Sequence, residues 1–217
     1  DLSGAELTGA TMTGVSSGQI TGAPLNLPAG WQLFGGYLIG PGADLSLADL
    51  TGVDLAGVKS GGITATGTPP TLPTDWKLIN GYLVGPGADL TNADLTNADL
   101  TGTDLTGANL TSATLTGVTS GGITATVTPP TLPTSWKLIN GYLIGPGADL
   151  TDATLTWPAD LNHATLTGAN LTGANLGVTT LNGATLTGAD LTGAYLTGAT
   201  LTNATLTHAT LSGATWT

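Results

Sequence analysis

Residues 88–110 decide the fold and read ADLTNADLTNADLTGTDLTGANL. Leucine returns at every fifth position, and a small residue, usually alanine, stands two places before it. The same register runs without a miss from Leu161 to Leu211, and Trp216 takes the next leucine place. Because residues two apart in a strand face the same side, the alanine and leucine of each unit point inward together. The next inward alanine lies three residues on, so a corner must follow every short strand.

A repeated strand and corner wind the chain into a solenoid whose axis is filled by leucine. A helix is excluded because, at 3.6 residues per turn, a spacing of five residues rotates about 140° beyond one full turn. The units Ala-Asp-Leu-Thr-Asn and Ala-Asn-Leu-Thr-Gly resemble those of pentapeptide-repeat proteins, and they recur over more than half of the chain. The resemblance implies an all-β fold, a right-handed quadrilateral β-helix (β-solenoid) with four pentapeptides, about 20 residues, per coil.

We expect residues 1–217 to form a single solenoid that is most regular over 161–217. Three variant modules interrupt it, at about 15–44, 58–89 and 118–149. The second and third copies keep the five-residue register across their whole length, so they are expected to wrap within the solenoid, whereas the first copy is two residues shorter. Between Leu155 and Leu161 one extra residue beside Trp157-Pro158 predicts a corner bulge.

Each module contains an Asn-Gly or Gly-Gly pair between two short apolar runs. Asn-Gly is the preferred pair of a type I′ turn, so Asn80-Gly81 and Asn140-Gly141 predict β-hairpins. Two successive solenoid faces with a corner at the same pair are the alternative. The prolines before each module tryptophan cannot donate hydrogen bonds to a ladder, which predicts that this stretch crosses a corner or bulges out.

Charge is scarce, with 8% charged residues and a net charge of −11, and threonine makes up 43 of the 217 residues. Three lysines and no arginine disfavour direct nucleic-acid binding, which rests on basic side chains. The sequence has no apolar run long enough to span a membrane and no cysteine. Because the chain begins at Asp1 and not at Met, we expect a processed chain or a fragment.

The titratable residues do not predict an enzyme. His163 and His208 occupy outward positions two coils and one face apart, so they are not expected to share a site. Twelve of the 14 acids stand directly before a register leucine, where we expect Asp to bond nearby backbone. Asp89, Asp94, Asp99 and Asp104 fall on four successive faces rather than at one point. We therefore predict no catalytic residues, no metal site and no cofactor.

Three functions fit a non-enzymatic solenoid. The first is self-assembly, because the chain is in register at both ends and uncapped strand edges invite pairing. Head-to-tail contact between unlike ends does not close, which predicts an end-to-end filament or a longer surface rod, extracellular or at the cell surface. The residues of this contact would be Leu2, Leu7, Leu206, Leu211 and Trp216.

The second is ice binding. With about 20 residues per coil, Thr-Leu-Thr units stack on one face, with files about 6.8 Å apart across the strand and about 4.8 Å apart along the stack. Such arrays resemble those of insect-type ice-binding solenoids. The threonines of this face are Thr165, Thr167, Thr185, Thr187, Thr205 and Thr207.

The third is DNA mimicry, since some pentapeptide-repeat proteins are known as duplex-DNA mimics that engage topoisomerases. Eleven charges over a rod of about 50 Å give roughly one per 5 Å, against one per about 1.7 Å in DNA. The predicted rod is too dilute in charge by about threefold.

The module aromatics recur at fixed places and have two interpretations. They are either platforms that stack on carbohydrate or core residues of the hairpin. The six residues are Trp31, Trp76, Trp136, Tyr37, Tyr82 and Tyr142. The predicted partner is accordingly a second copy of the chain, with ice or carbohydrate as the other ligands considered.

Overall fold

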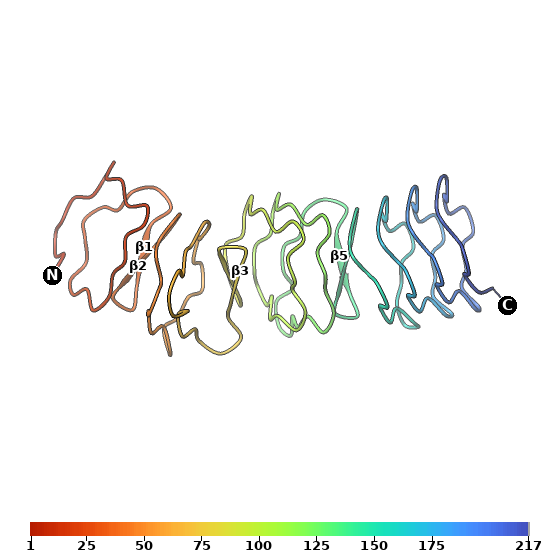
Figure 1. Cartoon of the computed structure of the whole chain (residues 1–217), viewed down its shortest axis with the longest axis horizontal. Helices are drawn as coiled ribbons and strands as arrows, with labels where there is room; N and C mark the ends of the chain where they lie inside the picture. Colours follow the sequence, from red (N-terminus) through yellow and green to blue (C-terminus); the bar gives the residue numbers. More distant parts are fainter. Residues whose placement is uncertain (217) are drawn as a thin grey trace. The chain divides into compact units, whose positions relative to one another are not determined.

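The computed structural model describes residues 1–216, which contain short strands, bridges and turns and no helix. The chain divides into two compact units. The first comprises Asp1–Ala93, Thr103–Thr111 and Ala125–Thr131, and the second comprises Asp94–Gly102, Ser112–Thr124 and Leu132–Thr217. Both units are built from stacked coils, and Figure 1 shows the regular coils of the second unit in blue.

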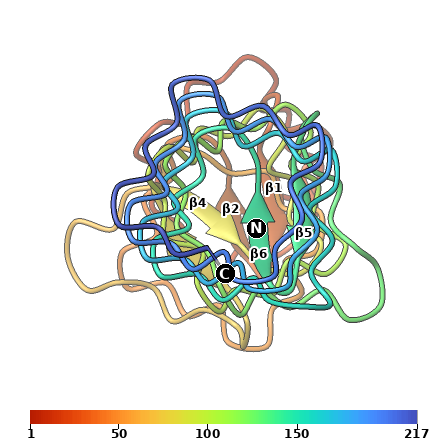
Figure 2. The same ribbon diagram turned by 90° about the vertical axis from the view of Figure 1, so that its right-hand side faces the viewer.

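The coils of the second unit stack in four columns of parallel bridges. One column joins Thr165, Thr185 and Thr205, so each partner lies four pentapeptides further along the chain. The other three begin at Asn170, Asn175 and Asp160 and repeat at the same interval. The regular coils of the second unit therefore have four bridged faces each. Figure 2 shows the blue coils closely superimposed along their stack.

Backbone hydrogen bonds between coils follow one pattern. The N–H of Leu186 donates to the Thr205 carbonyl at 2.7 Å, and the N–H of Thr205 donates to the Ala184 carbonyl at 2.8 Å. Within a coil, the Ala189 N–H donates to the Leu186 carbonyl at 3.0 Å and closes the corner. Gly188, the third residue of that corner, has φ 68°. A positive φ at this place alone is typical of a type II turn, which explains the glycines and asparagines there.

The core is formed by the inward alanines and leucines, as the register predicts. In the second unit these side chains are almost completely buried between Ala148 and Leu196. In the first unit Leu45, Leu50 and Leu55 are equally buried and pack with module residues such as Trp31. His163 and His208 take corner positions with φ 55° and 60°, and both are exposed, which confirms their outward placement.

The three Asn-Gly or Gly-Gly pairs form β-hairpins, which decides between the two predicted arrangements. The strands pair antiparallel as β1 (Gln32–Phe34) with β2 (Tyr37–Ile39), β3 (Lys77–Ile79) with β4 (Tyr82–Val84), and β5 (Lys137–Ile139) with β6 (Tyr142–Ile144). Asn140 and Gly141 both have positive φ, at 51° and 78°, as a type I′ turn requires.

Each hairpin is fixed to its coil by recurring polar contacts. In the third module the buried Ser120 hydroxyl accepts from the Leu143 N–H at 3.0 Å. The Gly141 carbonyl at the hairpin turn accepts from the Ile123 N–H at 3.1 Å. The Tyr142 hydroxyl accepts from the Thr154 N–H at 3.2 Å. The first module has the same three contacts, so the hairpin is a built part of the coil.

The hairpins lengthen the coils that contain them. Lys59 pairs with Asp89 and Thr119 with Asp149, which places two more pentapeptides between the partners than a regular coil has. Ser16 pairs with Asp44, and this interval is two residues shorter than in the other two modules. The shorter first copy is therefore confirmed.

The proline-rich stretches add length in a different way. Asp49 pairs with Thr71 and Asn109 with Thr131, so each of these intervals exceeds the regular one by two residues. The bridges on either side keep their faces in register. These two extra residues confirm the predicted bulge.

The single extra residue beside Trp157 is also accommodated. Thr154 pairs with Asn175, one residue beyond the regular interval, and the next face returns to that interval with Asp160 and Thr180. The corner carries the surplus, as predicted. Residues 1–216 include no helix of the length and apolar character that a membrane span needs.

Candidate functional site

The acids before the register leucines cap the corner that follows each leucine. Asp190 accepts from the backbone N–H of Thr192 at 2.9 Å and from its hydroxyl at 2.6 Å. Asp44 makes the same pair of contacts with Ser46. These hydrogen bonds to hydroxyl and backbone donors hold the pKa of Asp190 and of Asp44 below its usual value. The predicted role in local backbone bonding is confirmed.

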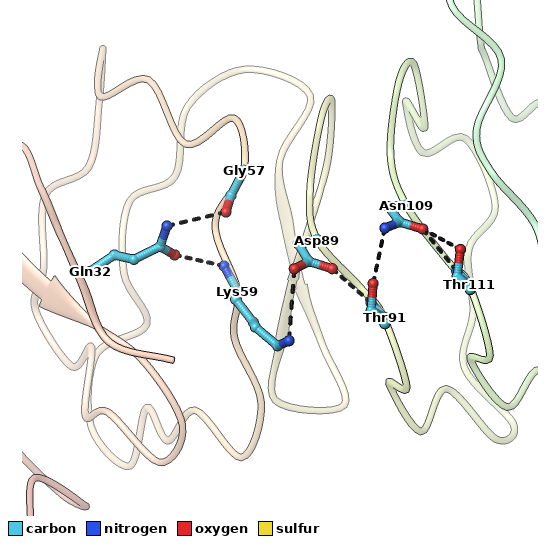
Figure 3. Close-up of polar contacts among 7 residues, drawn as sticks. All are labelled: Gln32, Gly57, Lys59, Asp89, Thr91, Asn109 and Thr111. Carbon is cyan, nitrogen blue, oxygen red and sulfur yellow. Dashed lines mark hydrogen bonds and ion pairs between the residues drawn. The ribbon is translucent and has the colours of Figure 1, made fainter. Parts of the chain in front are cut away.

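Side-chain contacts extend this arrangement from coil to coil in the first unit (Figure 3). Lys59 and Asp89 form an ion pair with 3.8 Å between Nζ and Oδ2. Asn109 donates to the Thr91 hydroxyl at 3.0 Å, and the Thr111 hydroxyl donates back to Asn109 at 2.6 Å. The acids and amides are therefore bound to neighbours of their own chain.

One face of the second unit lacks these acids and amides. On this face, which we call the threonine face, the residues before and after each leucine are Thr165, Thr167, Thr185, Thr187, Thr205 and Thr207. Backbone bridges stack Thr165, Thr185 and Thr205 directly on one another. The structure thus brings the six predicted residues onto one face.

The hydroxyls of the threonine face are not consumed within the protein. On the next face the Thr172 and Thr192 hydroxyls donate to Asn170 and Asp190 at 2.7 and 2.6 Å. Among residues 1–216, none of the six hydroxyls on the threonine face has a hydrogen-bond partner. The difference follows from one position, because threonine before the leucine has no carboxylate or amide oxygen to accept the second hydroxyl.

The predicted end residues lie on the outer coils of the two units. Leu2 and Leu7 are partly buried in the first coil, and Leu206 is partly buried in the last coil. Leu211 is 37% exposed and Trp216 is 48% exposed. These side chains are less covered than the leucines of inner coils, since each has a neighbouring coil on one side only.

The module tryptophans lie against glycine. An added Cβ at Gly145 would clash with the Trp136 ring, and Gly85 and Trp76 are related in the same way. Trp31 is 8% exposed, and Trp76 and Trp136 are partly buried. Tyr37, Tyr82 and Tyr142 are partly buried with their rings against the glycines Gly18, Gly61 and Gly121. Each ring is therefore covered on one side by a glycine of its own chain.

The second unit also carries exposed apolar side chains that the five-residue register does not predict. Trp157 is 73% exposed at the corner that carries the surplus residue, and Val178 at 56% and Tyr195 at 55% lie on later coils of the same unit. Each stands at an outward place that holds polar or glycine residues elsewhere. Their only signal in the sequence is that an apolar residue occupies an outward position.

The described part of the chain, 1–216, holds no cluster of three or more histidine, aspartate or glutamate side chains that fits a metal. Residues 1–216 form no pocket either. What the surface offers is the outward residues of the stacked faces and the edges of the outer coils.

Comparison with known proteins agrees with the repeat. The family model for pentapeptide repeats matches eight copies, over residues 87–119, 147–188, 159–198 and 179–215. No curated protein matches the chain.

Three solved structures that match the chain are described by their sequence identity and coverage. A pentapeptide repeat protein from the cyanobacterium Cyanothece 51142 is 32% identical over 55% of this chain and 64% of its own, with a TM-score of 0.33. This chain therefore spans less than two thirds of that protein. HetL from the cyanobacterium Nostoc sp. strain PCC 7120, involved in heterocyst differentiation regulation, is 28% identical over 80% of this chain and 87% of its own (TM-score 0.28).

The third is QnrB1, a plasmid-mediated fluoroquinolone resistance protein, which is 16% identical over 97% of this chain and 91% of its own, with a TM-score of 0.20. The matched repeats coincide with the coils in which leucine returns every fifth residue. The eight matched copies and the five-residue register together show that residues 87–119 and 147–215 carry pentapeptide repeats.

Proposed function

We propose that the protein is a non-enzymatic structural solenoid whose coils stack end to end on those of a second copy. We take its coil to be the right-handed quadrilateral of the family. The product of this stacking is a filament or a surface rod, placed outside the cell or at its surface. The observation that carries the proposal is the pattern of unpaired backbone groups on the outer coils.

The last coil carries one set of these groups. In the regular coils from Leu161 to Leu196 each register leucine N–H donates to the coil that follows, as Leu186 does to Thr205 at 2.7 Å. Within residues 1–216 the N–H groups of Leu201, Leu206 and Leu211 have no such acceptor. The carbonyls of the alanines beside them are likewise unused. Exposed strand edges of this kind favour pairing with another chain.

The first coil carries the complementary set. The Leu7 N–H donates to Asn26 at 3.0 Å, and the Ala5 carbonyl accepts from Leu25 at 2.8 Å. Glu6 lies between Ala5 and Leu7, and its N–H and carbonyl point away from the coil that contains Leu25 and Asn26. Neither group has a hydrogen-bond partner in the described chain. In an inner coil the groups at this place pair with an alanine carbonyl and a leucine N–H. The edge near Glu6 therefore matches what the last coil offers.

Low charge supports the same function. With 8% charged residues, copies meet at their ends with few like charges to separate them. DNA mimicry is less supported, because the acids lie on different faces and are bound to their own Ser, Thr and backbone donors.

Sedimentation and light scattering over a wide concentration range test the proposal, with negative-stain imaging of the same samples. We expect particles that lengthen with concentration by addition of whole chains. The variant Leu211→Lys places a charge in the contact at the last coil and is expected to prevent growth. Its matched control, Thr197→Lys, adds the same charge at an outward position and is expected to assemble normally.

A monodisperse monomer at the highest concentration would overturn the proposal. Equal loss of assembly in both lysine variants would contradict the role of the coil edge, since it would point to charge alone. Circular dichroism of each variant verifies that the coils remain folded.

A further inference from the structure

The threonine face differs from its neighbours in what its hydroxyls are free to bind. On the adjoining face the oxygens of Asn170 and Asp190 take the hydroxyl protons of Thr172 and Thr192. On the threonine face both threonines of each unit keep donor and acceptor capacity for an outside ligand. Three coils thus present six uncommitted hydroxyls in a fixed pattern.

The positions of these hydroxyls are set by the backbone. The backbone of Thr185 is held by two hydrogen bonds. Its N–H donates to the Ala164 carbonyl at 2.9 Å, and its carbonyl accepts from the Leu166 N–H at 2.7 Å. The carbonyls of Thr187 and Thr207 accept from Gly168 and Gly188, both at 2.9 Å. Threonine is β-branched, so few side-chain rotamers remain once its backbone is fixed. The hydroxyls are therefore ordered before any ligand arrives.

The chemistry of the face limits the ligand. Its six threonines, with Leu166, Leu186 and Leu206 between them, carry no formal charge. A charged polymer would find no counter-charge there, and a small molecule would find no pocket in residues 1–216. What the face offers is a regular array of threonine side chains, with spacings of about 4.8 Å along the stack and about 6.8 Å across it.

We propose that the threonine face binds the surface of ice. Ice is uncharged and periodic, and its surface oxygens both donate and accept hydrogen bonds, as threonine hydroxyls do. Because the hydroxyls are already fixed in rows, binding to a periodic solid costs little further side-chain entropy. This function does not depend on end-to-end stacking.

The variant Thr185→Asp tests the face with a change that the fold already uses. Asp190 stands at the equivalent place one face on and captures the Thr192 hydroxyl. Aspartate at 185 is expected to capture Thr187 in the same way, which removes two free hydroxyls from the middle coil and adds a charge. The matched control is Thr200→Asp, which makes the same change on a different face.

Thermal hysteresis and inhibition of ice recrystallisation are measured for the full chain at micromolar concentration. We expect activity in the unsubstituted protein and in Thr200→Asp, and its loss in Thr185→Asp. Partition of fluorescently labelled protein into a growing ice hemisphere gives a second readout that follows binding alone.

No hysteresis, no recrystallisation effect and exclusion from ice by the folded protein would overturn the inference. Equal activity in both aspartate variants would also overturn it, because the threonine face would then not be the contact. The same assays on Leu211→Lys separate ice binding from assembly, since that variant leaves the six threonines in place.

Discussion

The residue before an inward leucine is usually aspartate, asparagine or threonine. Its identity determines whether the hydroxyl of the threonine after the leucine is hydrogen-bonded within the chain. Asp190 engages Thr192, and Asn170 engages Thr172. Thr185 leaves Thr187 free in the described chain. A single residue per pentapeptide thus sets whether a face is closed on itself or open to a ligand.

The capping aspartates predict a loss of stability in acid. Hydrogen bonds from Thr192 lower the pKa of Asp190, and hydrogen bonds from Ser46 lower the pKa of Asp44. A lowered pKa in the folded state stabilises the fold above the unfolded value of about 3.9. That contribution disappears as the pH falls through the lower, folded pKa. We expect the melting temperature, followed by circular dichroism, to fall in strong acid.

The variant Asp190→Asn isolates this effect. Asparagine accepts the same two hydrogen bonds, as Asn170 does from Thr172 at 3.1 and 2.7 Å. The variant should match the parent at neutral pH and lose less stability in acid. A steeper acid loss in Asp190→Asn would contradict the assignment.

An inner leucine should contribute far more than any outward residue. Leu176 is 0% exposed, and Leu176→Ala is expected to lower the free energy of unfolding by about 2–5 kcal/mol, because it leaves a cavity between coils. The exposed Thr202→Ala should change it by less than about 0.5 kcal/mol. Urea unfolding measures both, and equal effects would argue against a leucine-filled axis.

The hairpin depends both on its own turn and on contacts with the preceding coil. Its turn needs two residues with positive φ, and its carbonyl at Gly141 also bonds Ile123 on the preceding coil. Its second strand, β6, is buried at Leu143 and Ile144. The Asn-Gly pair made the hairpin predictable from sequence. Its attachment to Ser120 was not, because nothing in a lone serine indicates which N–H it will meet.

The turn glycine should be less replaceable than a corner glycine. A Cβ at Gly141 would meet the Gly122 backbone N at 3.0 Å, whereas at Gly168 it would meet nothing within 4 Å. Both have positive φ, so Gly168→Ala should cost about 1–2 kcal/mol for backbone strain. Gly141→Ala should cost more in thermal or urea unfolding. Equal costs would mean that the turn is not tightly docked.

The serine that anchors the hairpin gives a second measure of docking. Ser120→Ala leaves the buried Leu143 N–H without its acceptor at 3.0 Å. An unpaired buried donor costs about 1–3 kcal/mol. The exposed Ser212→Ala should be nearly neutral in the same unfolding assay. A neutral Ser120→Ala would show that another acceptor replaces the hydroxyl.

At the scale of the whole molecule, the five-residue register made the coil predictable because the core repeats the same two inward residues. The threonine face could be located from the same count. That its hydroxyls are free could not, because it depends on which oxygens lie within reach across the leucine. The register also did not predict the exposure of Trp157, Val178 and Tyr195, because it indicates where a side chain points and not how much of it is covered.

Hydrogen exchange should report the open edge of the last coil. The N–H groups of Leu206 and Leu211 lack partners in residues 1–216, whereas Leu186 and Leu191 donate at 2.7 and 2.8 Å. We expect fast exchange at the first pair and slow exchange at the second in dilute protein. If copies stack, Leu206 and Leu211 should become protected as the concentration rises. Unchanged exchange in assembled samples would place the contact elsewhere.

The coils differ in length. A regular coil contains four pentapeptides, and the longest coils contain the length of six, yet the same faces stay in register. In the proline-rich stretches the two additional residues lie between bridged faces, because each face is held by its own bridges on both sides. The loop near Val127, which is 86% exposed, lies in one such stretch. The scaffold therefore tolerates insertion, and a foreign peptide grafted at this loop would be displayed without disturbing the coils above and below it.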